Sequence, residues 1–204
     1  MATTAPLITR SAALPTTQGA LHAYVGRSLD ALDARLRAAV ATVPADRLAV
    51  RPPDGGWSVA EVLEHCCLSN EAYLHPLEAL VQTARPDPSG DASQLPWRQT
   101  IVAGLLRRSL EMTIRLPAPR AIQPGPTPRA DTLDALVATH DRLRAVMSRA
   151  AALPWRRLRI ASPFAAVVRP NVGDACLIVL RHGERHARQI ERTAAAVATR
   201  SPGA

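Results

Sequence analysis

The feature of this sequence that most restricts its fold is a set of apolar runs with helical spacing, separated by segments dense in proline. In the first run, residues 18–43, leucine and valine recur at three- and four-residue steps, and Pro44 ends the pattern. A period of about 3.6 residues is typical of an amphipathic helix. The chain is therefore expected to bury its apolar surface by packing helices against one another.

Similar runs predict the other helices. Ser58, followed by Glu61 three residues later, is a capping-box signature for a helix that begins at Val59 and passes Leu77. Pro76 lies inside this run, so we expect a kink or a break there. Further helices are predicted over residues 97–116, 131–153 and 172–198.

Strand signals are scarce by comparison. Two segments, Leu158–Ile160 and Ala165–Val168, have β-like composition, and both are too short for more than a two-stranded ribbon. Prolines gather in the connections, most densely in residues 117–130. The pattern predicts an all-α protein, a four-helix bundle with proline-rich connecting loops.

Length and composition suit a single domain. The chain has 204 residues, and domains hold roughly 150 residues each. Residues 1–16 carry no apolar period and are predicted to form a flexible N-terminal arm, which leaves residues 17–204 as one helical-bundle domain. Hydrophobic residues make up 47% of the chain and aromatic ones only 3%, so the core must consist mainly of aliphatic side chains.

Several function classes are excluded or disfavoured by residue counts. All 25 basic residues are arginine, which excludes a lysine nucleophile, a Schiff-base lysine and a P-loop lysine. Three cysteines, two of them adjacent at positions 66 and 67, are too few for a disulfide scaffold and favour a reducing compartment. We see neither a signal-peptide pattern nor an apolar run of membrane-spanning length, so a cytoplasmic location is expected.

The sharpest chemical feature is the pair His182 and His186. Residues four apart on a helix lie one above the other, so both imidazoles can reach one ion. A helical wheel places the pair on the apolar side of its helix, near Gln189. The motif differs from that of zinc proteases, because Gly183 stands where they carry glutamate. Two buried histidines with ordinary hydrogen bonds are the alternative interpretation.

A catalytic metal usually takes about three protein ligands and keeps one position open. His65 is the best third ligand, because it lies two turns into the capped helix at the margin of its apolar stripe. Without the pair near the C-terminus it would be an ordinary boundary histidine. His75 and His140 are predicted to be surface or packing residues, and His22 is a weaker fourth neighbour.

Two segments together carry a family resemblance. Residues 56–65, GWSVAEVLEH, resemble the first signature of the DinB/YfiT-like superfamily, in which a Trp-Ser or Trp-Thr at a helix start precedes a metal-binding histidine by two turns. Residues 181–192 resemble the second signature, a His-x-x-x-His pair followed by Gln-Ile. Residues 162–174 are similar to the loop that leads into the last helix of that family.

The resemblance implies a four-helix bundle with a divalent ion on His65, His182 and His186. Zinc or nickel is the expected metal, with iron or manganese as the alternatives. The family includes transferases and isomerases that use low-molecular-weight thiols, and members without a known activity. It therefore implies a small-molecule substrate, a thiol among the candidates, and is compatible with a homodimer. Residues 107–130 are unusually rich in arginine and proline, so the choice of substrate does not transfer.

A three-histidine metal site would suit nucleophilic chemistry, because a bound ion lowers the pKa of coordinated water from 15.7 to about 7 and deprotonates a coordinated thiol. The sequence thus predicts a metal-dependent enzyme, either a thiol-dependent S-transferase or a hydrolase, without assigning its general acid or base. A bundle that binds metal without catalysis stays open. Cys66 is expected in the core, and Glu61, Ser69 and Gln189 are candidates to orient the ligands.

An alternative of another class is a basic helical bundle that binds nucleic acid or an acidic partner. The net charge is +8 and the pI about 11.0, and four arginines lie along one side of the last helix. Interleaved glutamates and the lack of stacking aromatics favour a solvated face instead, so nucleic acid is the less favoured partner. The four residues are Arg181, Arg185, Arg188 and Arg192.

Overall fold

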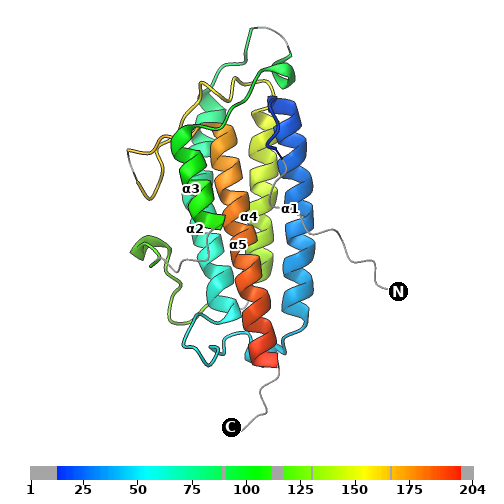
Figure 1. Ribbon diagram of the computed structural model, residues 1–204, viewed down its shortest axis with the longest axis vertical. Helices are drawn as coiled ribbons and strands as arrows, with labels where there is room; N and C mark the ends of the chain where they lie inside the picture. Colours follow the sequence, from blue (N-terminus) through cyan, green and yellow to red (C-terminus); the bar gives the residue numbers. More distant parts are fainter. Residues whose placement is uncertain (1–12, 89–90, 112–116, 130, 166, 199–204) are drawn as a thin grey trace, which may run out of the picture.

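The computed structural model describes residues 13–88, 91–111, 117–129, 131–165 and 167–198. Over these residues the protein is all-α with no strand longer than an isolated bridge, which confirms the predicted fold class. Figure 1 shows the long helices side by side, with a shorter one against them. The helices are α1 (Gln18–Ala41), α2 (Val59–Thr83), α3 (Ile101–Glu111), α4 (Thr132–Arg149) and α5 (Val172–Ala198).

Side-chain pairs define the direction of each helix in the bundle. Tyr24 and Arg35 of α1 bind Arg181 and Glu191 of α5, so these two helices run parallel. In the same way α2 and α4 run parallel, since residues 67 and 78 contact residues 132 and 142. The first pair is antiparallel to the second, as the bonds between residues 30 and 144 and between 37 and 134 require.

The parallel course of α2 and α4 explains the long connection between them. After α2 ends, the chain must return along the whole bundle before α4 can begin, and residues 84–131 make that crossover. Helix α3 lies within it and packs on α5 (Figure 1). The crossover also contains the 3₁₀ turns η2 (Ala92–Gln94) and η3 (Arg120–Ile122), of which η3 packs against α2.

Helix α3 begins later than its apolar period predicts. The residues from Trp97 to Thr100 form a non-helical lead-in because Trp97 is anchored elsewhere: its backbone N–H donates to Thr16 O at 2.7 Å and its ring is buried. The predicted start at residue 97 is therefore wrong, whereas α5 has the predicted bounds. Residues 112–116 of the predicted helix lie outside the described residues.

Helix α2 does not break at Pro76. A proline inside a helix removes one backbone hydrogen bond and costs about 3 kcal/mol. Leu74, Leu77 and Val81 are buried on either side of it, and burying each such side chain contributes about 1.5–3 kcal/mol. Tertiary packing thus outweighs the local cost. Of the kink or break expected from the sequence, the break is wrong, and the kink stays a prediction.

The start of α5 is fixed by a buried polar network. Asn171 Oδ1 accepts the backbone N–H of Asp174 at 2.9 Å, and the Asp174 carboxylate accepts the N–H of Asn171 at 3.3 Å. The Trp97 indole N–H donates to the same Asn171 Oδ1 at 3.0 Å. Gly173 lies under this indole, where a Cβ would overlap the ring. The network therefore holds the helix that carries the histidine pair.

The end of the predicted arm touches the bundle. Leu14 packs against the core, and the carbonyl of Thr16 holds the N–H of Trp97. The rest of the predicted arm, residues 1–12, lies outside the described residues, so its flexibility stays a prediction. Of the described helices, none combines the length and hydropathy needed to cross a membrane.

Candidate metal centre

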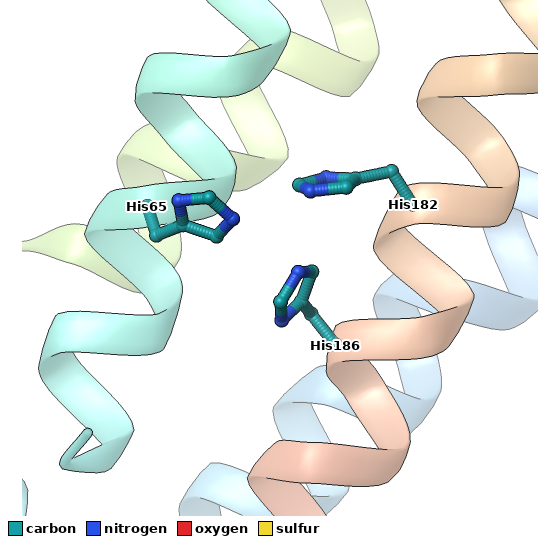
Figure 2. Close-up of side chains that lie close together, drawn as sticks. All are labelled: His65, His182 and His186. Atoms are coloured by element: carbon teal, nitrogen blue, oxygen red, sulfur yellow. The ribbon is translucent and has the colours of Figure 1, made fainter. Parts of the chain in front are cut away.

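Three histidines from two helices meet inside the bundle. His65 comes from α2, and His182 and His186 come from consecutive turns of α5. Their rings face one another in Figure 2, with centroid separations of 5.1, 4.7 and 4.4 Å. One ligand atom from each lies within 4.8 Å of the other two, so the group could hold a metal ion. The structure thus brings together the three residues that the sequence singled out.

The position of His65 follows from the way α2 begins. The Ser58 hydroxyl accepts the N–H of Glu61 at 3.2 Å, and the Glu61 carboxylate accepts the N–H of Ser58 at 2.8 Å. This is the predicted capping box. Arg51 holds the same carboxylate through both its oxygens. Glu61 therefore fixes the helix start, and it is not the residue that orients a histidine.

The crossover orients His65. Its Nδ1 donates to the carbonyl of Ile122 in η3 at 2.7 Å, which leaves Nε2 with a lone pair for a metal. The Trp57 ring lies 4.9 Å from the imidazole, centroid to centroid, and limits its rotation. Neither neighbour was found from the sequence. A main-chain carbonyl in a proline-rich loop has no sequence signature, and the Trp57 signal was visible only as part of the family motif.

On α5, Gln189 orients His186. Its Oε1 accepts a hydrogen bond from His186 Nδ1 at 2.9 Å, so Nε2 of this histidine is also the atom left for a metal. The sequence predicts Gln189 as a candidate to orient a histidine ligand. His182 differs, because its buried Nδ1 has no hydrogen-bond partner among the described residues. Ser69 is buried, and within the described part of the chain it does not bond to a histidine.

Burial keeps the three imidazoles neutral. Loss of solvent lowers the pKa of His65 and lowers that of His182 well below its usual value. Burial, followed by the neighbouring His65 ring and nearby arginines, lowers the pKa of His186 to about 3. Neutral imidazole is the form that coordinates a metal, so the group has its lone pairs available near neutral pH.

The other three histidines lie elsewhere. His75 is exposed and contacts Glu71 with 3.2 Å between Nε2 and Oε2. His140 of α4 is fully buried, and its Nδ1 donates a hydrogen bond to the carboxylate of Asp33 in α1. It is therefore a packing residue. His22 lies against Trp155, with ring centroids 6.1 Å apart, and does not join the group. The prediction of a surface or packing role for the first two is confirmed.

Cysteine and arginine side chains follow the sequence expectations in part. Cys66 is buried in the core, as predicted, and burial raises the pKa of its thiol. Arginines along α5 have partners within the fold. Arg181 binds Glu184 and Tyr24, and Arg185 donates to Leu110 O. Such internal contacts weaken the case for this side of α5 as a nucleic-acid surface.

The fold and the site together define a class of protein: a helical bundle with a buried three-histidine group between its second and last helices. The chain belongs to the DinB superfamily, whose family model matches residues 28–190 and so includes all three histidines. No curated protein and no solved structure matches the chain significantly. The comparisons therefore establish the family without naming a reaction.

Proposed function

We propose that this protein is a metal-dependent enzyme in which His65, His182 and His186 hold one divalent ion. The main support for this proposal is that three neutral imidazoles converge, with one ligand atom from each within 4.8 Å of the other two. Two of the rings are oriented by hydrogen bonds through Nδ1, the arrangement that protein metal ligands normally show. Zinc or nickel suits an all-imidazole donor set, and iron or manganese would be the next choice.

The unpartnered nitrogen of His182 supports the same assignment. A buried polar atom without a hydrogen bond costs about 1–3 kcal/mol, and a ligand that met this nitrogen inside the three-histidine group would offset that cost. A polar group placed this way fits a metal site better than a purely structural cluster. The set also contains no carboxylate among the described residues, which is the three-ligand pattern that leaves a coordination position open.

The proposed activity is nucleophilic attack on a small molecule. An ion held here would supply a nucleophile near neutral pH by lowering the pKa of a bound water or thiol. The protein's own contribution is to hold the imidazoles in place, with Ile122 and Gln189 fixing two rings and Trp57 covering one side. A thiol-dependent S-transferase and a hydrolase are the two reaction classes that this chemistry serves.

Metal analysis of the purified protein tests the proposal. We expect about one equivalent of a divalent ion after loading with Zn²⁺ or Ni²⁺, and loss of that ion in H65A, H182A and H186A. H75A is the matched control, because His75 is exposed and outside the group, and it should retain the metal. Turnover would then be sought with a panel of low-molecular-weight thiols and of esters and amides. A wild-type protein that binds no metal would overturn the assignment.

A further inference from the structure

Two neighbouring residues of α2 hold the part of the crossover that contains η3. Nδ1 of His65 donates to the carbonyl of Ile122 at 2.7 Å, and the carboxylate of Glu64 accepts the backbone N–H of Gly125 at 2.9 Å. The side chain of Ile122 is buried as well. The first of these hydrogen bonds orients one of the three histidines, whereas Glu64 lies outside the three-histidine group.

The bond to Glu64 uses a scarce donor. Pro124 and Pro126 have no backbone N–H, so within residues 124–126 Gly125 carries the only one. Glu64 is half-buried, and a carboxylate accepts a hydrogen bond more strongly than a neutral oxygen does. Glu64 is thus the side chain that attaches this proline-flanked stretch to α2.

Short-range bonds keep the turn between the two attachment points in shape. The N–H of Ile122 donates to the carbonyl of Pro119 at 3.0 Å, and the side-chain amide of Gln123 donates to the carbonyl of Ala118 at 3.0 Å. Pro124 has a fixed φ angle, which stiffens the chain between Gln123 and the residue that Glu64 holds. A restraint at residue 125 therefore also restrains the carbonyl three residues before it.

The carbonyl of Ile122 decides which nitrogen of His65 is available to a metal. A carbonyl oxygen only accepts hydrogen bonds, so it keeps the ring proton on Nδ1 and leaves the lone pair on Nε2. If the carbonyl moved away, the proton would be free to shift to Nε2, where it blocks coordination, and the ring would be free to turn. Loss of such a partner lowers metal affinity about 10- to 100-fold.

We propose that Glu64 is a positioning residue for the metal site. By holding Gly125 it places the Ile122 carbonyl, and that carbonyl sets the tautomer and the orientation of His65. The inference rests on the proposed metal site and adds a residue that controls its affinity from outside the ligand set. Because coupling between two binding events is reciprocal, a bound ion in turn holds the crossover segment more firmly.

Zinc affinity, measured by competition with a chelator, tests this role. E64A should bind Zn²⁺ about tenfold more weakly than wild type. E64Q should stay within about threefold of wild type, because its amide oxygen still accepts the Gly125 N–H. The matched control is E78A, which removes a carboxylate that binds Arg142 at 2.9 Å, more than three turns beyond His65 on the same helix. It should bind Zn²⁺ as wild type does.

Three results of this comparison would overturn the inference. Wild-type affinity in E64A would show that Glu64 does not position the site. An equal loss in E64Q and E64A would show that the negative charge acts on the ion directly, without the hydrogen bond. An equal loss in E78A and E64A would show that affinity follows the general stability of α2.

Limited digestion with trypsin gives a second measurement, because Arg120 is an exposed residue of η3. Cleavage after Arg120 in the metal-free protein should be faster in E64A than in wild type and E78A, and bound Zn²⁺ should slow it in wild type. Equal cleavage of metal-free E64A and wild type would overturn the inference, as would a wild-type rate that bound Zn²⁺ leaves unchanged. A wild-type protein that binds no Zn²⁺ would instead overturn the proposed function on which the inference rests.

Discussion

Replacing Gly173 by alanine should destabilise the protein strongly, because the start of α5 has no room for a methyl group. A Cβ at this position would overlap Trp97 Nε1, and it would lie 2.7 Å from Leu21 Cδ2 and 2.8 Å from Trp97 Cε2. Both neighbours are buried, so neither can move into solvent. G173A must therefore displace the indole or the helix itself.

The expected magnitude has two parts. Overpacking a close-packed core costs about 1–3 kcal/mol. Displacing the indole also breaks its hydrogen bond to Asn171 and leaves a buried donor unpaired, which costs about 1–3 kcal/mol more. We expect a loss of about 4 kcal/mol in the free energy of unfolding. For a chain of this size that corresponds to a fall in Tm of about 8–16 °C.

Thermal and denaturant unfolding, followed by circular dichroism at 222 nm, would measure the effect. The matched control is G26A in α1, where a Cβ would meet nothing within 4 Å. It should stabilise the protein by about 0.5–1 kcal/mol, because alanine is the better helix former. If G173A stayed within about 0.5 kcal/mol of wild type, the indole would not be fixed as described, and the reasoning would be refuted.

Three further predictions follow from the site and the core. Q189L removes the hydrogen bond that orients His186 and should lower metal affinity about 10- to 100-fold, measured by competition with a chelator, whereas unchanged affinity would deny Gln189 this role. Burial raises the pKa of Asp33, but its two hydrogen-bond donors outweigh that effect and hold the pKa below its usual value. Asp33 therefore stabilises the fold fully above about pH 4. The free energy of unfolding of D33N should be about 1.5–3 kcal/mol lower than that of wild type there, and this difference should shrink as the pH falls below 4. Urea unfolding at each pH would measure it. Cys66 and Cys176 are buried with raised thiol pKa values, so a maleimide should label them only after denaturation, and rapid labelling of the native protein would contradict their burial.

The sequence predicted most of the bundle because its helices depend on periodic burial. The runs over residues 18–43 and 172–198 each match a helix within two residues, since their apolar stripes face the core along their whole length. The errors lie where long-range packing overrides local preference. Helix α2 continues through Pro76 because the leucines around it are buried, and Trp97 is held in a non-helical segment by Thr16 and Asn171.

The three histidines of the candidate site were predictable because, like the core, they depend on the helical period. Histidines four apart on an apolar face, with a third on a capped helix, lie on regular elements whose side-chain directions follow from the helical period. The parts that orient His65 were missed because they depend on the course of the crossover. Ile122 acts through its main chain, and nothing in its residue type reveals that its carbonyl meets a ring 57 positions earlier.

The packing of α1 against α5, far from it in the sequence, has a consequence for biosynthesis. The apolar stripe of α1 is covered mainly by α5, which is synthesised after the other four described helices. About 130 residues separate the two helices, and at about 5–20 residues per second their synthesis takes roughly 7–26 s. During that interval the nascent chain exposes the apolar stripe of α1, to which a chaperone could bind. His65 meets its partners only after α5 has been synthesised, so any metal must be loaded after that point, in competition with the cell's other metal buffers.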